Sequence, residues 1–219
     1  MLGSTPEPTS FNPRVCGEIM SGCRCGSTRA ASPSTHASAA GGVLVLMTAH
    51  DERKEVSTLL EAMLPPGCLL VQTPGTPLER IRRDYLELAA SDVRPCLLAV
   101  GAAWTGLDLS GDALSAQTGR PISARDDCVL TDLIIPTAPI GLNRTLTHEW
   151  RRERSGMIAE VTSTCFLFRQ GIGRLVRRDG LPHNRRLHFL DSRIHEREWA
   201  FLLSPVRRIL EAYARRVTV

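Results

Sequence analysis

Short, largely apolar runs alternate along this chain with stretches whose apolar residues recur at helical spacing. The apolar runs cover residues 43–47, 68–71, 96–100, 128–135 and 187–190. A strand that is apolar on both faces must be covered on both, as in parallel sheets that lie between layers of helices. The alternation therefore predicts an α/β fold, with a parallel sheet and helices on both of its faces.

Cap residues suggest where two of the helices begin. Asp51 follows the first predicted strand and is expected to cap the helix that carries Val56 and Leu60. Ser204 and Pro205 are expected to start the last helix, because serine caps helices and proline is tolerated in the first turn.

Residues 1–42 differ in composition from the rest of the chain, since they are rich in Ser, Thr, Ala, Pro and Gly. Such a segment cannot bury enough apolar surface to offset its chain entropy, so a disordered tail or linker is predicted. Residues 43–219 are predicted to form one domain. Cys16, Cys23 and Cys25 lie in the tail without a recognised zinc spacing, so no metal is assigned to them.

The composition is that of a globular protein with a mildly basic charge, +4 at pH 7. That charge permits a polyanionic partner without requiring one. No apolar run reaches the length of a membrane-spanning helix, so no membrane partner is expected. Four cysteines lie in apolar runs and resemble small buried side chains of a cytosolic protein, which predicts a cytoplasmic location: Cys68, Cys96, Cys128 and Cys165.

The stretch at 166–178, with the sequence FLFRQGIGRLVRR, has two different faces if it is a helix. Gln170, Arg174 and Arg177 lie on one face, because side chains three and four residues apart stack along a helix. Apolar side chains occupy the opposite face and would point to the core. The polar face would thus present one amide and two guanidinium groups.

Two glycines interrupt this predicted helix. Gly171 and Gly173 each destabilise a helix interior by roughly 1 kcal/mol relative to alanine. Their presence beside the arginines suggests that another group approaches the backbone closely. The alternative is an ordinary amphipathic helix with a solvated basic face.

A second unusual segment, GAAWTGLDLSGD at 101–112, follows the third predicted strand. Its glycines would let backbone N–H groups line a concavity for a phosphate or another anion. Asp108 could hold a ribose hydroxyl or an arginine. The alternative is a tight crossover loop in which the glycines only turn the chain. Binding sites of parallel sheets lie at the carboxyl ends of strands, and this segment lies at one.

The two segments together resemble motifs V and VI of the second RecA-like motor domain of superfamily 2 DNA helicases of the DinG/XPD type. The strand at 43–47 with Thr48 and His50 is similar to motif IV, and the resemblance covers residues 43–215. The family usually has an acidic residue where Thr105 stands, so no role is carried over for that carboxylate. The compact domain and the sequence at 141–144 resemble the CRISPR-associated DinG-like helicases of type IV systems.

The resemblance implies a RecA-like fold and ATP-driven movement on single-stranded DNA. Arg174 and Arg177 would reach the γ-phosphate, with Arg177 most like an arginine finger, which stabilises charge in the transition state. Gln170 and Gly173 would couple the presence of nucleotide to domain closure.

The remaining implied roles fall at the carboxyl ends of strands. Gly106 and Asp108 would lie between the ATP cleft and the DNA path. Thr48 and His50 would contact the DNA backbone independently of base sequence. Trp104 is a further candidate for DNA contact by base stacking, although packing beneath the 101–112 segment is the favoured interpretation.

The sequence contains no G-x-x-x-x-G-K-[ST] phosphate loop and no D-E-A-H-type metal-binding motif. In the family these belong to the first motor domain, which would bind most of ATP and Mg²⁺. The cysteines that hold an iron–sulfur cluster in many relatives would also lie there, so no cluster is expected here. We therefore expect a fragment of a longer helicase, or one half of a split motor, that is inactive alone.

The implied partners are single-stranded DNA, a first RecA-like domain and a CRISPR ribonucleoprotein complex. The competing hypothesis is a non-catalytic adaptor that kept a helicase fold and binds nucleic acid or protein. An unrelated nucleotide-binding α/β enzyme is the least favoured. The arginine run at 151–154 is expected to be a solvated helix face, with DNA contact as the alternative. No chemistry is assigned to His148, His183, His188 or His195.

Overall fold

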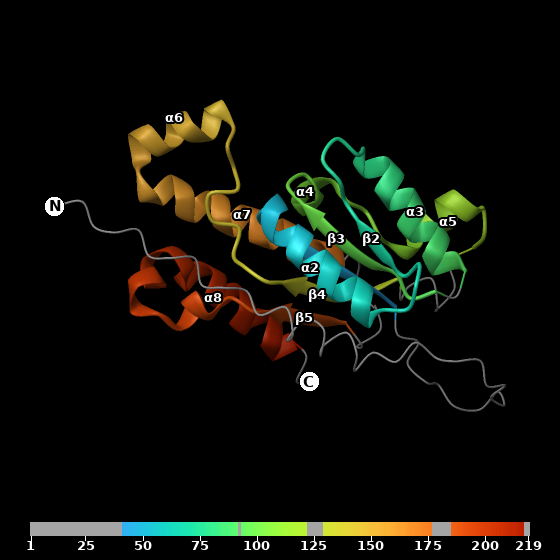
Figure 1. The fold of residues 1–219 in the computed structure, drawn as a ribbon. Helices are drawn as coiled ribbons and strands as arrows, with labels where there is room; N and C mark the ends of the chain where they lie inside the picture. Colours follow the sequence, from blue (N-terminus) through green and yellow to red (C-terminus); the bar gives the residue numbers. More distant parts are fainter. Residues whose placement is uncertain (1–40, 92, 122–128, 177–184, 217–219) are drawn as a thin grey trace.

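The computed structural model of this protein describes residues 41–91, 93–121, 129–176 and 185–216 (Figure 1). They form a five-stranded, all-parallel sheet flanked by helices, which confirms the predicted α/β fold. The topology is consistent with a RecA-like domain. Nearly all of the predicted tail lies outside these ranges, as do several residues discussed above: Cys16, Cys23, Cys25, Cys128, Arg177 and His183.

The strands are β1 (Gly42–Met47), β2 (Leu69–Val71), β3 (Cys96–Val100), β4 (Leu130–Ile135) and β5 (Arg186–Phe189). The helices are α2 (His50–Met63), α3 (Leu78–Ala90), α4 (Ala103–Gly106), α5 (Gly111–Thr118), α6 (Leu146–Ser155), α7 (Met157–Leu175) and α8 (Ala200–Arg216). Two 3₁₀ turns, η2 (Ser192–His195) and η3 (Arg197–Trp199), precede α8. Each strand lies within two residues of its predicted position.

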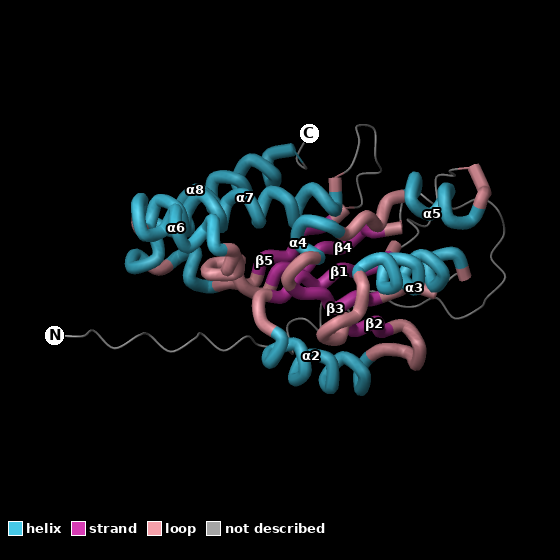
Figure 2. Tube along the Cα trace, turned by 90° about the horizontal axis from the view of Figure 1, so that it is seen from above, coloured by secondary structure: helices cyan, strands magenta, loops and turns pink. Residues whose placement is uncertain are grey.

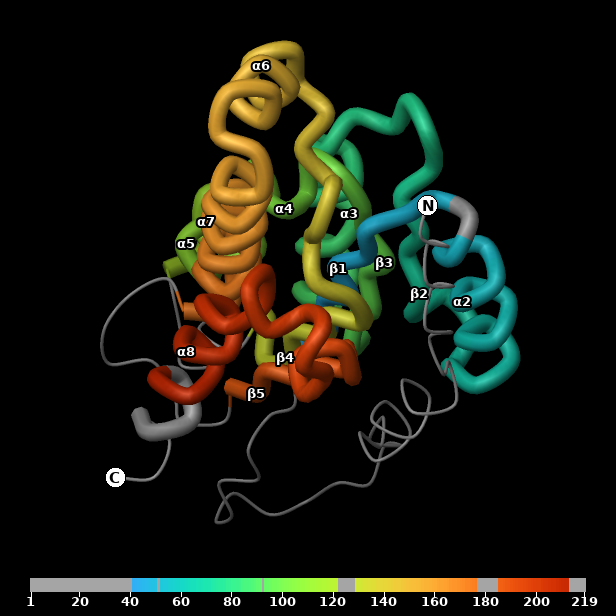
Figure 3. The backbone as a smooth tube through the Cα atoms, turned by 90° about the vertical axis from the view of Figure 1, so that its left-hand side faces the viewer, coloured from blue at the N-terminus to red at the C-terminus, as the bar shows by residue number. Residues whose placement is uncertain are grey.

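The sheet has the order β2-β3-β1-β4-β5, so that β1 is central. Side chains alternate along β1: Leu44 and Leu46 pack in a core with residues of α3, α4 and α7, whereas Val43 and Val45 pack against α2. Figures 2 and 3 show α2 on one side of the sheet and α7 on the other. Burial on both faces explains why the run at 43–47 is apolar throughout.

Two predicted helix starts are wrong. Helix α2 begins at His50, and its cap residue Ala49 has extended backbone and makes no side-chain cap, so Asp51 lies inside the helix. Helix α8 begins at Ala200 and contains Pro205 in its interior. Leu203, in the turn before the proline, is buried in the core, and this packing stabilises a turn that local sequence preferences alone would not start.

A buried carboxylate lies in the interior of β4. Asp132 is 1% exposed and accepts hydrogen bonds from Arg94 at 2.8 Å and from His188 at 3.1 Å, while Arg186 Nε lies 2.7 Å away. Burial by itself would raise the pKa of Asp132, but hydrogen bonds from His188, Arg186 and Thr131 outweigh it and hold the pKa at about 2. The charged form of Asp132 therefore stabilises the packing of β3, β4 and β5.

We predict that Asp132→Asn lowers the free energy of unfolding at pH 7 by about 3 kcal/mol, because Arg94 stays buried without its charged partner. The folded pKa lies below the ordinary 3.8, so the ionised carboxylate stabilises the fold above that value. Roughly 2 kcal/mol of this stability should be lost as the pH falls from about 5 to 2. Urea denaturation across that range measures both effects.

The half-buried carboxylate Asp84 on α3 provides the control, because the arginine beside it, Arg80, is exposed, and Asp84→Asn therefore leaves no buried charge without a partner. In Asp84→Asn the free energy of unfolding should fall with pH as steeply as in the parent. In Asp132→Asn it should fall less steeply, because the titrating carboxylate is absent. An acid dependence that is equally steep in the parent and in Asp132→Asn would contradict this account of Asp132.

Candidate functional site

The candidate site lies at the carboxyl ends of β1 and β4, which are neighbours in the sheet. The chain leaves β1 toward the β2 edge and leaves β4 toward the β5 edge, so the two connections diverge. Binding crevices of open α/β sheets form at such points. Thr48 follows β1, Thr137 follows β4, and their hydroxyl oxygens lie 2.9 Å apart. The structure thus places Thr48 at the point where a ligand is expected.

His50 is exposed on the first turn of α2, next to Thr48. Its Nδ1 lies 3.0 Å from the guanidinium of Arg53, a buried group that also donates to the carbonyl of Gln72. The side chain of Gln72 in turn accepts a hydrogen bond from the backbone of Val100 at 2.9 Å. Arg53 and Gln72 were not singled out from the sequence, because nothing local shows that a charged residue of α2 points inward.

The segment after β3 turns sharply and forms a short helix instead of an open loop. Gly101 has φ +58°, in the left-handed region that glycine adopts without strain. The N–H groups of Trp104, Thr105 and Gly106 then donate to the carbonyls of Gly101 and Ala102. These three amides are therefore used inside α4, and the predicted concavity of free N–H groups does not include them.

Asp108 and Gly106 shape the chain around this turn. Asp108 Oδ1 accepts a hydrogen bond from the backbone of Ser110 at 3.2 Å, and the Ser110 hydroxyl caps α5 by accepting from Ala113. A Cβ added to Gly106 would lie 3.1 Å from a methyl group of Leu78. Both residues thus have a local structural use at the carboxyl edge of the sheet.

Trp104 is wholly buried beneath this segment. Its indole N–H donates to the carbonyl of Met47 at 3.0 Å, and its ring packs against Gly171 on α7. Packing is therefore confirmed, and base stacking on Trp104 is wrong because the ring exposes no surface. The close approach predicted at the glycines is made by this ring at Gly171. At Gly173 an added Cβ would meet nothing within 4 Å.

Arg174 is buried as well, which corrects the prediction that α7 presents it on an exposed face. Its guanidinium donates to the carbonyl of Leu107 at 2.8 Å and to that of Thr105. The segment after β3 lies across α7 and covers Arg174, a tertiary contact that helical periodicity does not report. Gln170 is half-buried, and Arg177 lies outside the described residues. The two segments singled out from the sequence are nevertheless in direct contact.

A buried carboxylate, that of Asp191, lies two residues after the end of β5. Asp191 accepts hydrogen bonds from the backbone of Ala138 at 2.8 Å and from the guanidinium of Arg193 at 2.8 and 2.7 Å. Arg193 also lies 4.7 Å from the ring centre of Trp199. On the neighbouring α2, burial raises the pKa of Glu52, and the charge of Arg193 partly opposes that rise. The hydrogen bond from Ala138 to Asp191 thus joins the segment after β4 to the residues that follow β5.

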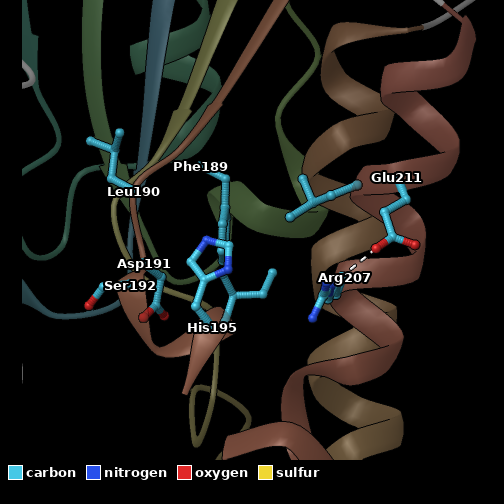
Figure 4. Close-up of a pocket in the computed structure, with 9 residues that line it drawn as sticks. Phe189, Leu190, Asp191, Ser192, His195, Arg207 and Glu211 are labelled. Atoms are coloured by element: carbon cyan, nitrogen blue, oxygen red, sulfur yellow. Dashed lines mark hydrogen bonds and ion pairs between the residues drawn. The ribbon is translucent and has the colours of Figure 1, made fainter. Parts of the chain in front are cut away.

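A pocket of about 470 Å³ opens between the end of β5 and α8 (Figure 4). Its polar side chains include His195 and an ion pair between Arg207 and Glu211 at 3.1 Å, and its walls include Phe189 and Leu210. Asp191 also lines it, but both carboxylate oxygens already accept hydrogen bonds from other groups. We assign no acid–base role to this pocket.

The carboxyl edge carries hydroxyl and imidazole groups that can bind an anion. The hydroxyls of Thr48 and Thr137 and the exposed imidazole of His50 are groups that hydrogen-bond phosphate oxygens. Within the ranges that the structure describes, no three His, Cys, Asp or Glu side chains gather as a metal site would require. None of the described helices is long and apolar enough to cross a membrane.

Comparison of the sequence with protein-family models and with curated proteins finds no match.

The two glycines of α7 provide a matched pair of substitutions. Gly171→Ala should destabilise the fold by about 1–3 kcal/mol, because the new methyl group would meet a fully buried ring that cannot move aside. Gly173→Ala should leave stability unchanged or raise it by up to about 1 kcal/mol, since alanine favours helix and the space is open. Chemical denaturation measures both. Equal effects at the two positions would contradict the packing of Trp104 against Gly171.

Proposed function

We propose that this chain is the second RecA-like motor domain of an ATP-dependent DNA helicase of the DinG/XPD type. The observation that supports the proposal is the contact between the segment after β3 and α7. These segments resemble motifs V and VI, and Arg174 joins them through the carbonyls of Thr105 and Leu107. Such a contact would let nucleotide state and DNA position influence each other, as a motor requires.

In this proposal Arg177 is the arginine finger. A planar guanidinium beside the transferred phosphoryl group stabilises charge that develops in the transition state. Arg174 is a positioning residue, because its guanidinium is held by carbonyls of its own domain. Gln170 and Gly173, on the same helix, complete the surface that couples nucleotide binding to domain closure.

The DNA side of the proposal uses the carboxyl edge of the sheet. Thr48 and His50 would bind phosphates of single-stranded DNA, and Gly106 and Asp108 would lie between the DNA and the nucleotide. Binding of this kind is independent of base sequence and weakens as salt is raised.

ATP and Mg²⁺ would be held mainly by a first motor domain, on this chain's gene or on a partner chain. The proposed setting is the cytoplasm, with single-stranded DNA as substrate and a CRISPR ribonucleoprotein complex as a partner. Hydrolysis by this chain without the first domain is not expected.

The adaptor hypothesis has one observation in its favour. Arg174 is buried and its guanidinium is held by the carbonyls of Leu107 and Thr105, a structural role that does not require nucleotide. The two hypotheses differ in whether Arg177 affects catalysis, and this difference can be measured.

The test combines this chain with the first motor domain encoded upstream of it, identified by a lysine-bearing phosphate loop. Arg177→Ala should lower ATP hydrolysis stimulated by single-stranded DNA by about 10³-fold, the effect typical of an arginine finger. Arg169→Ala, an exposed arginine on the same helix, removes the same charge and should leave hydrolysis near the parent rate.

Hydrolysis that is unaffected by Arg177→Ala would overturn the motor proposal. So would the absence of a first domain both upstream and on any partner chain, together with binding of DNA by the chain alone, a combination that would favour the adaptor.

A further inference from the structure

A groove of about 770 Å³ lies between α7 and α8, which run side by side in the structure (Figures 2 and 3). Most of the residues that line this groove are apolar, among them Val161, Ile172 and Ile209. The groove shares no lining residue with the pocket beside β5. Gln170 and Arg174 do not line it either, so the proposed motor function leaves the groove without a use.

Exposed apolar side chains extend the groove along both helices. Ile158 lies two helical turns before Cys165, a lining residue of α7, and therefore on the same face of that helix. Phe201 lies one turn before Pro205, a lining residue of α8. Ile158 and Phe201 are each 64% exposed, and Phe166, which lines the groove itself, is 57% exposed. Large apolar side chains gathered in this way mark a surface that another molecule covers.

The charged residues that line the groove are two exposed arginines, Arg169 of α7 and Arg208 of α8. Among the described residues, no acidic side chain pairs with either of them. The one acid of α7, Glu160, lies at least about 100° around the helix from every lining residue of α7. The one acid of α8, Glu211, is paired with Arg207 at 3.1 Å and lines the other pocket. Two like charges at one groove attract a partner that carries carboxylates.

We propose that the groove between α7 and α8 binds an acidic amphipathic helix of a partner protein. Apolar side chains of the partner, spaced three and four residues apart, fill the groove, and carboxylates beside them meet Arg169 and Arg208. Positions 158–172 of α7 span about 21 Å, which matches a partner helix of about four turns. This inference goes beyond the proposed function and does not depend on it.

The choice of a helix follows from the elements that form the groove. An extended segment needs a strand edge for its backbone hydrogen bonds, and two helices provide none, whereas a helix satisfies its own backbone. The choice of another protein follows from charge. Residues 1–40 of this chain contain two glutamates and three arginines, so the tail does not complement the charge of the groove.

The probe is a fluorescein-labelled peptide of about 18 residues, made of Leu, Ala and Glu, with leucines on one helix face and glutamates on both sides of them. Its affinity for the full chain is measured by fluorescence anisotropy at low salt. The control peptide has Gln in place of every Glu and keeps the leucine face. The Glu peptide should bind about 5- to 30-fold more tightly than the Gln peptide, the gain expected from two exposed ion pairs.

Variants at exposed positions locate the contact without disturbing the core. Arg169→Ala/Arg208→Ala should remove the preference for the Glu peptide and leave the affinity for the Gln peptide nearly unchanged, because only the ion pairs are lost. Phe166→Glu should weaken binding of both peptides at least about 10-fold, since it places a charge in the apolar groove. Arg80→Ala/Arg83→Ala removes two exposed arginines of α3 and is the matched control, which should bind both peptides as the parent does.

Cys165 reports on occupancy of the groove, because its half-buried side chain lines it. The Glu peptide at ten times its Kd should slow alkylation of Cys165 by N-ethylmaleimide about 10-fold, as measured by mass spectrometry of the proteolytic fragment that contains this residue. Burial raises the pKa of the Cys165 thiol, and the charge of Arg169 partly opposes that rise. Rates are therefore compared with and without peptide in each variant.

Three results would overturn the proposal. The first is equal affinity of the parent for the Glu and Gln peptides, or binding that leaves the alkylation of Cys165 unchanged. The second is protection of Cys165 by laurate when neither peptide binds, which would assign the groove to a fatty acid. The third is self-association of the parent, measured by sedimentation velocity and abolished by Phe166→Glu, which would assign the groove to a second copy of this chain.

Discussion

The indole of Trp104 joins the three parts of the candidate site. Its N–H is bonded to the end of β1, its backbone belongs to the segment after β3, and its ring fills the space left by Gly171 on α7. Because the ring is entirely buried, the three elements cannot shift independently without opening a cavity in the core. Arg174 makes a second contact between the same helix and the same segment. The geometry of the carboxyl edge depends on this packing.

The sheet could be predicted from the sequence because a strand that is buried on both faces consists of an uninterrupted run of apolar residues, as β1 does. The same reasoning placed Thr48 and Asp108 at the carboxyl edge. It failed for Arg174 and for Pro205, since their environments come from segments distant in the chain. Periodicity shows which residues share a helix face, but it cannot show what covers that face. Arg53 was missed for the same reason.

Charged groups serve different purposes at different places in the sheet. Asp132, inside β4, satisfies its buried charge with Arg186 and His188 of the neighbouring β5 and with Arg94, which precedes β3, and these contacts stabilise the fold. Near the carboxyl edge, Asp191 positions the ends of β4 and β5, while the hydroxyl of Thr48 and the imidazole of His50 lie where a ligand can meet them. Stability and the proposed binding are therefore assigned to separate sets of residues.

Two hydrogen bonds from the guanidinium of Arg174 go to main-chain carbonyls of the segment after β3, those of Leu107 and Thr105. A carbonyl is present whatever the side chain, so these two hydrogen bonds do not depend on which side chains stand at positions 105 and 107. The side chain of Thr105 is exposed, and its hydroxyl donates to the carbonyl of Ala102 at 3.4 Å. A substitution of the Thr105 side chain therefore leaves the carbonyl that accepts from Arg174 in place.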